Sequence, residues 1–409
     1  MSEFIFADQN DRTIPAEDAI FGISQRANAA KAAGREVING TIGMLLGDDG
    51  KPMVLSSVAS EIKTISAEEF APYAPIGGTP GYRAAVKRAA FRSYTPKSEV
   101  RVVATPGGTG AIRTAVANYT NRGDRILTTD WHWGPYNKIA DEQGRSVVSF
   151  GLFNENRGFN LEAFEEKIKE LLSEQEDLLI IINTPAQNPT GYEVTLEEWD
   201  QIVAILSAIP KDKRATLLVD TAYIDFAGDE DRVRGFLPKL EELPGNVFPM
   251  LAFSLSKTFT MYGMRCGALI AMAPSEEIAE EFVRVCEFSC RATWSNSPRI
   301  GQSLIEKIFA DEELLKEVTR ERAEIGKVLH ARGRAFEKAA EEAGLEILPY
   351  DSGFFVTVPC DDPKGLGLKL EEEGIFLVPF GKGLRVSVAS VTEDQCRIIP
   401  AKILEAMKK

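Results

Sequence analysis

The sequence predicts an α/β fold in which a mostly parallel, seven-stranded sheet is wrapped by helices and joined to a smaller α+β domain. Two patterns predict it. Between residues 80 and 300, short apolar segments alternate with segments of helical period, as in strands linked by helical crossovers. After residue 342, the pattern changes to short strands and one last helix. The length of 409 residues also exceeds that of one ordinary domain.

The first region contains seven apolar segments of strand length. The expected strands are 100–104, 125–129, 146–150, 178–182, 215–219, 247–253 and 266–272. The expected helices are 81–94, 109–121, 161–173 and 196–208. Short, continuous apolar runs suit strands that are buried on both faces, so we expect a largely parallel sheet with its functional site at the carboxyl ends of the strands.

The second region begins with a long, charged helical stretch. Helix is expected at 298–342 and 393–407, and strands are expected at 345–348, 353–358, 376–378 and 384–388. We therefore predict a large domain, 48–320, and a small domain formed by 1–47 and 321–409.

Composition restricts the possible partners. A formal net charge of -14 argues against nucleic acid, because a phosphate backbone favours basic surfaces. The apolar stretches are strand-sized, and the N-terminus lacks the basic and apolar regions of a signal peptide, so we expect a cytoplasmic protein without a membrane span. Five scattered cysteines and only two histidines support neither a disulfide framework nor a metal site.

One lysine, Lys257, follows the strand expected at 247–253 in a turn rich in serine and threonine. Ser254 and Arg265 can donate hydrogen bonds to a phosphate, and Gly263 and Gly267 permit close approach of the backbone. This arrangement is typical of a lysine that binds pyridoxal 5'-phosphate covalently. Taken alone, the segment also fits a solvated surface lysine.

Polar residues at other strand ends supply the partners that this cofactor needs. Asp220 ends the apolar run 215–219, where its carboxylate can keep a pyridine nitrogen protonated. Tyr223 and Asn188 can reach the phenolic oxygen of the ring. The segment around Asn188, Asn-Pro-Thr-Gly, also fits an ordinary turn.

A glycine-rich segment follows the strand expected at 100–104 and opens the helix expected at 109–121. Free amides at that helix start, with the Thr109 hydroxyl, would form a phosphate cradle next to Gly108. A dinucleotide fingerprint is disfavoured, because Arg113 occupies the place of its third small residue.

With these residues, the chain resembles the fold type I pyridoxal phosphate enzymes, and among them the aspartate and aromatic aminotransferases of class I. The resemblance covers most of the chain. It implies that Lys257 is the Schiff-base lysine and that Asp220 contacts the pyridine nitrogen. It also implies roles at the cofactor for two groups of residues. Tyr223 and Asn188 would contact the phenolic oxygen, and Gly108, Thr109, Ser254 and Arg265 would hold the phosphate.

The same resemblance implies further contacts. Trp133 would stack on the cofactor ring, and Tyr73 would reach the phosphate of the neighbouring subunit of a homodimer with shared active sites. Gly43, Trp133 and Asn188 would flank the substrate, and Arg385 would bind its α-carboxylate. Phe4, Phe6, Phe21, Trp294 and Phe354 are candidates for an apolar lining of the substrate site.

Arg291 resembles the arginine that crosses the dimer interface and pairs with the distal carboxylate of a dicarboxylic substrate. An interface ion pair is the alternative for this residue. Two positions depart from the family pattern. Tyr136 stands where a histidine often supports the pyridine-nitrogen aspartate, and Gln187 precedes the Asn-Pro-Thr-Gly segment. Both departures leave the tuning of the ring nitrogen open.

The expected activity is transamination between an aspartate or aromatic amino acid and 2-oxoglutarate by ping-pong kinetics, with Lys257 as catalytic base and with Asp220 and Tyr223 as the other catalytic residues. A base that works near neutral pH needs a pKa below the usual lysine value, and nearby cations can supply that shift. A lyase or decarboxylase acting on an amino acid uses the same residues around the cofactor. A transcription regulator would need an added basic DNA-binding module, which the sequence does not contain.

Overall fold

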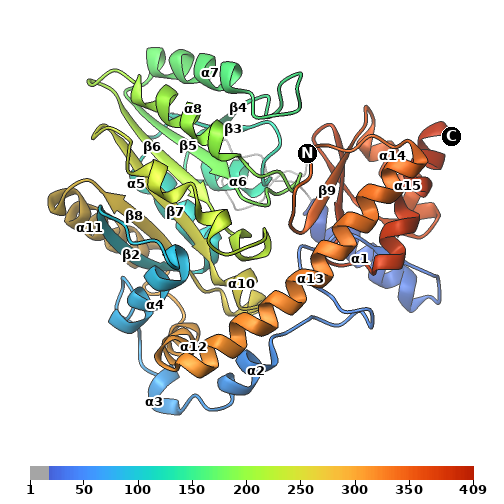
Figure 1. The fold of residues 1–409 in the computed structure, drawn as a ribbon, viewed down its shortest axis with the longest axis horizontal. Coiled ribbons are helices and arrows are strands. Elements are labelled where there is room, and N and C mark those ends of the chain that lie inside the picture. The colour runs from blue at the N-terminus through green and yellow to red at the C-terminus, as the bar shows by residue number, and fades with distance from the viewer. Residues whose placement is uncertain (1–17) are drawn as a thin grey trace, which may run out of the picture. The chain divides into compact units, whose positions relative to one another are not determined.

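The computed structural model describes residues 18–409 (Figure 1). The chain divides into two compact units, and the division falls within one long helix, after residue 327. The large unit contains residues 53–187 and 192–327, and the small unit contains the described residues among 1–52, together with 188–191 and 328–409. The domain limits expected from the sequence stay a prediction. Phe4 and Phe6 lie outside the described residues.

The large unit contains the seven-stranded sheet, in the order β2-β8-β7-β6-β5-β3-β4. Its strands are β2 Glu99–Thr105, β3 Arg125–Thr129, β4 Ser146–Phe150, β5 Asp177–Asn183, β6 Arg214–Asp220, β7 Val247–Ser254 and β8 Gly267–Ala273. Only β8 runs antiparallel to its neighbours in this sheet, β2 and β7. The predicted fold class, with a mostly parallel seven-stranded sheet, is confirmed.

Helices surround this sheet. They are α2 Ser56–Ile62, α3 Ala67–Phe70, α4 Pro80–Phe91, α5 Gly107–Asn118, α6 Pro135–Glu142, α7 Leu161–Glu174, α8 Leu196–Ser207, α9 Leu237–Leu240, α10 Leu255–Thr258, α11 Glu276–Thr293, α12 Arg299–Ala310 and α13 Glu312–Ala343. Short 3-10 turns occur at Ile224–Phe226, Arg232–Arg234 and Tyr262–Met264. The charged stretch expected as one helix is therefore two, α12 and α13. They meet at Asp311, whose carboxylate accepts hydrogen bonds from the Glu313 and Leu314 amides.

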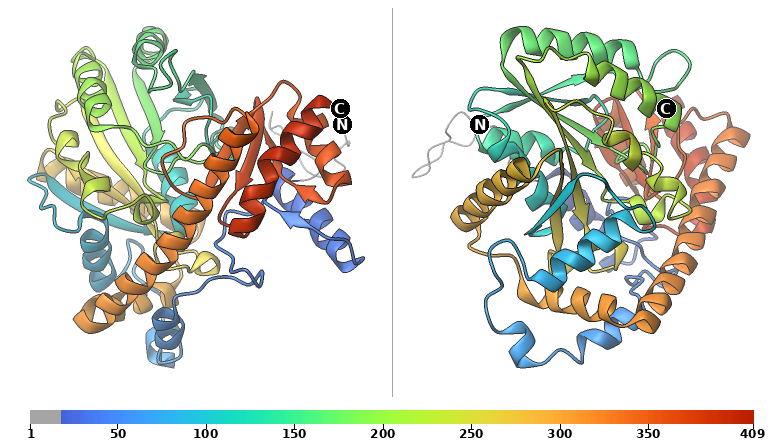
Figure 2. Two further views of the ribbon diagram at one scale, coloured as in Figure 1. Left: turned by 45° about the vertical axis from the view of Figure 1, so that its right-hand side comes forward. Right: turned by 60° about the vertical axis from the view of Figure 1, so that its left-hand side comes forward.

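Both faces of the sheet are covered by helices, as the two views of Figure 2 show. On one face, α5, α6 and α11 pack through Ile112, Ile139 and Phe282 onto a buried apolar cluster of the central strands. On β4, Val147 packs against that cluster. Phe150, three residues on, points to the opposite face, where its ring centroid lies 5.2 Å from that of Phe164 in α7. Burial on both faces explains the continuous apolar strand sequences.

The small unit is α+β. It contains α1 Ala19–Ala32, β1 Ile38–Asn39, β9 Phe355–Pro359, α14 Pro363–Glu372, β10 Ile375–Phe376, β11 Val378–Phe380, β12 Gly383–Ser387 and α15 Glu393–Lys408. Strands β11, β12 and β9 form an antiparallel sheet, and β1 pairs with β10 in parallel. The segment before residue 53 is thus joined to the C-terminal part of the chain by strand pairing.

The strand expected at 345–348 is wrong, because this segment has irregular backbone. The apolar residues of this segment suggested a strand, but only one residue of 345–348 is buried, Leu345 at 7% exposure. The Leu348 amide donates one hydrogen bond to the Thr357 carbonyl of β9, and one bond does not make a ladder.

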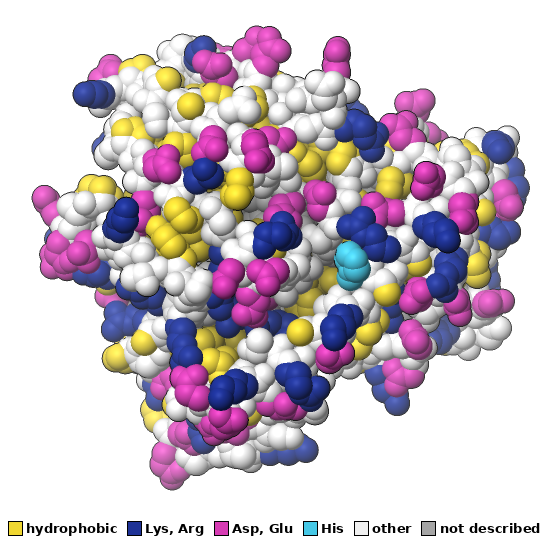
Figure 3. Space-filling view, viewed as in Figure 1, with side chains coloured by type: hydrophobic (Ala, Val, Ile, Leu, Met, Phe, Trp, Pro, Cys, Tyr) yellow, Lys and Arg dark blue, Asp and Glu magenta, His cyan; other side chains and the backbone are white. Residues whose placement is uncertain are grey.

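On the face of the molecule in Figure 3, acidic and basic side chains are interspersed. Within residues 18–409, no helix combines the length and the apolar composition needed to span a bilayer.

Candidate active site

Functional side chains of the large unit meet at one edge of its sheet. Thr105 at the end of β2 and Ser254 at the end of β7 both pair with Gly267, the first residue of the antiparallel β8. Asp220 ends β6, the next strand, and Lys257 lies in α10, which follows β7 directly. The order and direction of the strands therefore bring together residues that are up to 162 positions apart in the chain, as expected for this fold.

The backbone at this edge is closely packed. A Cβ atom added to Gly267 would lie 2.5 Å from the Gly107 carbonyl carbon. A Cβ atom on Gly107, where φ is +72°, would lie 2.6 Å from Arg265 Nη2, and one on Gly108 would lie 3.3 Å from Ser254 Cβ. Gly263, also expected to permit close approach, faces open space within the described residues, so that expectation is wrong.

These glycines bring a helix start, a hydroxyl and a guanidinium close to one another. The first turn of α5 presents backbone amides there, and Thr109 is exposed in that turn. Arg265, with φ 52°, is held by hydrogen bonds from Nη1 to Ser256 Oγ, at 3.3 Å, and to the Tyr262 carbonyl, at 3.1 Å. Free amides and a cation make this an anion-binding position.

Lys257 is enclosed by aromatic rings and by charge. Its Nζ lies 5.3 Å from the ring centroid of Tyr223 and 5.8 Å from that of Tyr262. Burial, and secondly the positive charge of Arg265, lower the pKa of Lys257 to about 8, although Asp220 acts in the opposite direction. With this pKa, about a tenth of the amine is neutral and nucleophilic at pH 7, a far larger share than at the usual lysine pKa.

Asp220 is 5% exposed and receives a hydrogen bond from the Tyr136 hydroxyl, with 2.6 Å between Oη and Oδ2. The Ala222 amide donates to its other carboxylate oxygen at 3.2 Å. Burial raises the pKa of Asp220, while the Tyr136 hydrogen bond acts to lower it. Tyr136, where the family often has histidine, thus supports the carboxylate directly. The resemblance to the family had singled out position 136, but it did not show that a phenol there could donate this hydrogen bond to Asp220.

Two further predicted site residues, Trp133 and Tyr223, are aromatic. The Trp133 indole packs edge-on against Tyr136, with 5.6 Å between ring centroids and an interplanar angle of 87°. Tyr223 is 6% exposed. Gln187, the other departure from the family pattern, donates a hydrogen bond to the Trp131 carbonyl and so fixes the loop that carries Trp133.

Both ring nitrogens of the histidine in this loop have hydrogen-bond partners. His132 Nδ1 lies 2.7 Å from the Thr129 carbonyl and Nε2 lies 2.7 Å from Asn137 Nδ2. Burial lowers the pKa of His132. A neutral imidazole with both nitrogens in hydrogen bonds is poorly placed to act as a base.

Asp225 was missed by the sequence analysis. Its side chain is fully buried, and Oδ2 accepts a hydrogen bond of 2.7 Å from Thr258, the residue after Lys257. Oδ1 receives Arg234 at 2.6 Å and Arg92 at 3.4 Å. Arg322 of α13 reaches the same cluster through Glu230. Asp225 therefore ties α10 to α4 and α13. Five charged residues spread over 231 positions give no local motif that could have revealed this cluster.

In the small unit, Arg385 and Asn188 come together. Arg385 Nη1 donates to Asn188 Oδ1 at 3.2 Å, and Nη2 donates to the Thr41 carbonyl at 2.8 Å. The guanidinium carbon lies 4.3 Å from the ring centroid of Phe355. The Phe355 ring also abuts Gly43, where an added Cβ would lie 2.7 Å from Cζ. The structure thus holds Arg385, the residue predicted to bind the substrate α-carboxylate, against Asn188, and the Phe355 ring contacts both Arg385 and Gly43.

Tyr73 and Arg291 are not brought to the cofactor residues within one chain by any hydrogen bond or ion pair of the described residues. Tyr73 is 88% exposed in the loop between α3 and α4. Arg291 is exposed near the end of α11, and its Nη1 donates to Ser295 Oγ at 2.6 Å.

Comparison with known proteins assigns the family. The sequence model of the family Aminotransferase class I and II matches residues 35–403. The chain belongs to this family. An aspartate aminotransferase of Salmonella typhi is 27% identical over 402 residues, 94% of this chain and 96% of the relative. A tyrosine aminotransferase of Klebsiella pneumoniae is 25% identical over 360 residues, 84% and 87% of the two chains.

Solved structures agree. An aminotransferase from Anaerococcus prevotii is 37% identical, with a TM-score of 0.95 and coverage of 99% of this chain and 100% of that one. An aromatic-amino-acid aminotransferase from Burkholderia pseudomallei, covalently bound to pyridoxal phosphate, shares the fold at 22% identity, with a TM-score of 0.82 and coverage of 98% and 100%. The chain is thus an aminotransferase with pyridoxal 5'-phosphate as cofactor, and both predictions are confirmed. The family supports transamination over the lyase and decarboxylase alternatives.

The residues at the sheet edge fit this cofactor. The small glycines leave backbone amides, Ser254 and the Arg265 guanidinium close together at this position, which suits a phosphate. Lys257 offers an amine with a pKa of about 8 beside it. The buried Asp220 offers a carboxylate to a ring nitrogen.

We predict that Gly267→Ala weakens cofactor binding. The added methyl group would lie 2.5 Å from the Gly107 carbonyl carbon, and the start of α5 must shift to relieve that contact. Titration of the cofactor-free protein with pyridoxal phosphate should show at least about a tenfold rise in Kd, equivalent to ~1.4 kcal/mol. Gly263→Ala, whose Cβ meets no atom within 4 Å, is the matched control and should bind normally. Equal affinities for the two variants would contradict the assignment of this edge as the phosphate position.

A second prediction concerns Asp225. Arg234 and then Arg92 hold the pKa of Asp225 far below its usual range, against the opposing effect of burial. A depressed folded-state pKa contributes stability that is complete above the unfolded value, near pH 4, and is lost as the pH falls below it. Asp225→Asn should therefore lower the free energy of unfolding by about 3 to 5 kcal/mol at pH 7, and this difference should shrink below about pH 4.

Urea unfolding at several pH values would measure the effect. Asp200→Asn, which removes an exposed ion pair with Lys239, serves as the control and should cost less than about 1 kcal/mol. If Asp225→Asn fails to fold, Thr258→Val removes only the Thr258 hydrogen bond and should cost about 1 to 3 kcal/mol. A difference between wild type and Asp225→Asn that does not change with pH would contradict the buried-charge account.

Proposed function

We propose that this aminotransferase moves an amino group between an aspartate or aromatic amino acid and 2-oxoglutarate by a ping-pong mechanism, with Lys257 as the residue that binds the cofactor covalently and then carries the proton. The observation that supports this most directly is the enclosure of Lys257 by Tyr223, Arg265 and the Asp220 edge, with a pKa of about 8. A neutral amine there can both form a covalent bond and accept a proton near neutral pH.

When bound, pyridoxal phosphate supplies an electron sink for charge that develops at the substrate α-carbon. Asp220 would keep the ring nitrogen protonated, and the Tyr136 hydroxyl would orient that carboxylate. Tyr223 and Asn188 would contact the ring's phenolic oxygen, and Trp133 would cover a ring face. Gly108, Thr109, Ser254 and Arg265 would bind the phosphate, which the helix start and the guanidinium favour electrostatically.

Arg385 would bind the α-carboxylate of every substrate. Its planar guanidinium can bind a carboxylate bidentately, and its position over Phe355 limits its rotation. Gly43 would let the backbone flank the substrate where a side chain would collide with Phe355. Arg291 would pair with the distal carboxylate of aspartate or 2-oxoglutarate.

The homodimer with shared active sites is part of this proposal. Tyr73 at 88% exposure and Phe288 at 76% exposure are large aromatic side chains that water would disfavour. They belong to adjoining elements, because a Cβ on Gly77 would lie 2.5 Å from Glu287 Oε1 of α11. Arg291 lies one helical turn after Phe288 on the same helix. This continuous exposed surface suits a second copy of the chain. The predicted domain limits and cytoplasmic location stay predictions.

Replacement of Lys257 tests the central proposal. Wild-type protein loaded with pyridoxal phosphate should absorb in the visible and transaminate aspartate or phenylalanine. Lys257→Ala should lose the covalent visible band and at least about a thousandfold of turnover, because nucleophile and base are removed together. Lys211→Ala, at an exposed lysine after α8, should retain both. A colourless wild type, or an active Lys257→Ala, would contradict the assignment.

Mixing of inactive chains tests the shared site. Tyr73→Phe/Arg291→Ala and Lys257→Ala chains should each be nearly inactive, and a mixture should regain part of the activity, since one hybrid site of each mixed dimer is intact. Sedimentation would establish the dimer. A fully active monomer would refute this proposal.

Substrate preference tests Arg291. Loss of a charge-assisted contact to the distal carboxylate costs on the order of 2 to 5 kcal/mol, so kcat/KM for aspartate in Arg291→Ala should fall roughly thirtyfold to several thousandfold. The value for phenylalanine should change much less. Arg385→Ala should impair both substrates. An unchanged ratio of aspartate to phenylalanine activity in Arg291→Ala would make Arg291 a structural ion-pairing residue.

A further inference from the structure

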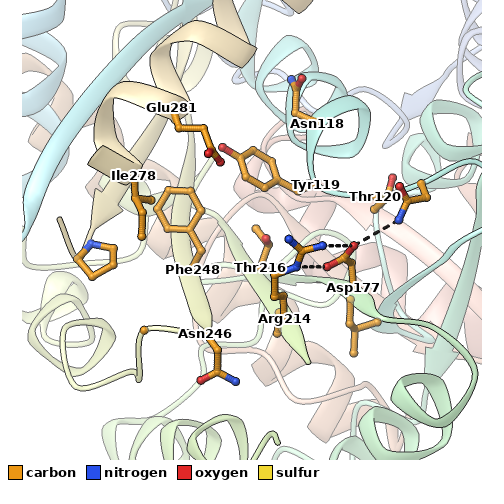
Figure 4. A pocket seen from close by; sticks show the side chains of 15 residues that line it. Asn118, Tyr119, Thr120, Asp177, Arg214, Thr216, Asn246, Phe248, Ile278 and Glu281 are labelled. Atoms are coloured by element: carbon orange, nitrogen blue, oxygen red, sulfur yellow. Dashed lines mark hydrogen bonds and ion pairs between the residues drawn. The ribbon is translucent and has the colours of Figure 1, made fainter. Parts of the chain in front are cut away.

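A second cavity lies at the opposite edge of the large unit's sheet. It has a volume of about 330 Å³ and is formed by the end of α5, the starts of β5, β6 and β7, and the first turns of α11 (Figure 4). The strands between this edge and Asp220 are seven residues long, which corresponds to roughly 20 Å. The cavity is therefore separate from the candidate active site.

One charged pair in the cavity is already neutralised. Arg214 donates from Nε to Asp177 Oδ1 at 2.6 Å and from Nη2 to Oδ2 at 3.0 Å. Asn121 donates a third hydrogen bond to Asp177 at 3.3 Å. A bidentate pair of this kind carries no net charge, and it leaves the Asp177 carboxylate little capacity to accept hydrogen bonds from a ligand.

Glu281 provides a second carboxylate and is exposed to solvent. Arg214 acts on it electrostatically, but that guanidinium is paired with Asp177. Within residues 18–409, the Glu281 carboxylate makes no hydrogen bond or ion pair, and in Figure 4 it lies beside the hydroxyl end of Tyr119. Burial is the largest cause that raises the pKa of Tyr119, and Glu281 adds to it, so the phenol stays neutral. Two carboxylates against one guanidinium give the cavity a net negative charge, which favours a cation over an anion.

The remaining wall is aromatic and apolar. The rings of Tyr119 and Phe248 meet at 60° with 5.6 Å between centroids, and Ile278 lies beside Phe248 (Figure 4). Pro274 also lines the cavity. Such a wall suits an aromatic ring, which gains both burial and edge-to-face contact. A cation near the Tyr119 face gains a further electrostatic contribution.

We propose that this cavity binds a primary arylalkylamine, with its ammonium group on Glu281 and its ring against Phe248 and Ile278. An anion with the same ring would be repelled by the net negative charge of the cavity. The volume is at the lower end of the range for small-molecule sites, in keeping with a ligand of one ring and a short chain. The class lacks an α-carboxylate, the group that Arg385 is proposed to bind, so its binding is distinguishable from that of a substrate.

Calorimetric titration of the cofactor-loaded protein with 2-phenylethylamine in low-salt buffer tests this proposal. We expect a Kd of about 1 mM or tighter, and weaker binding of 3-phenylpropionate, the anionic analogue. Glu281→Gln should weaken amine binding about threefold to tenfold. Glu280→Gln, which removes an adjacent exposed carboxylate that does not line the cavity, is matched in charge and should bind like wild type.

Cofactor absorbance, recorded in parallel, reports whether the amine reaches the Lys257 site. Binding that depends on Glu281 and leaves this absorbance unchanged supports the proposal. It is overturned if no binding occurs at 10 mM amine (roughly tenfold above the expected Kd), if Glu281→Gln and Glu280→Gln bind equally, or if 3-phenylpropionate binds more tightly.

Discussion

Gly107 and Gly267 approach so closely that one added carbon on Gly267 would lie 2.5 Å from the Gly107 carbonyl carbon. This contact brings the start of α5 against the edge where β7 and β8 pair. Because no side chain intervenes, the helix amides, Ser254 and the Arg265 guanidinium surround one anion position. The placement of Lys257 depends on the same edge, since α10 begins directly after β7 and Arg265 lies two residues before β8. The proposed phosphate contacts and the cation that acts on Lys257 therefore lie at the same part of the sheet.

Burial opposes the charged forms of both ionisable residues at this edge, Lys257 and Asp220. The pKa of Lys257 is lowered by burial and by Arg265, and the pKa of Asp220 is raised by burial. Tyr136 opposes the second effect through a hydrogen bond that favours the ionised carboxylate. A phenol does this without adding a charge of its own. Histidine at the same position would add a second titrating group, so the chain attains a comparable contact by a different electrostatic route.

Asp225 connects this chemistry to the scaffold. Its carboxylate binds Thr258 on one side and two arginines on the other. Thr258 and Arg234 are buried, and the Arg92 side chain is 11% exposed. Because a buried charge is expensive to leave unpaired, the cluster restricts how far α10 can move without loss of stability. The position of Lys257 is thus coupled to α4 and α13, which contribute nothing to the cofactor contacts themselves. At the other sheet edge, the exposed Glu281 makes no hydrogen bond or ion pair among the described residues, so its carboxylate is accessible to a ligand.

The sequence by itself determined the seven strands of the large sheet, because each is a short apolar run buried on both faces. It also singled out Lys257, Asp220, Gly108 and Arg265 as candidate cofactor residues, since each follows or opens such a run, and the fold brings them to one edge of the sheet. Tertiary structure decided what depends on distant partners. Tyr136 meets Asp220 across 84 positions, and Asp225 pairs with Arg92 and Arg234 from two separate parts of the chain. Residues 345–348 have the composition of a strand but lack a ladder partner. Local patterns report burial and chain direction, whereas pairing of polar groups is fixed only when the folded chain brings them within hydrogen-bond distance.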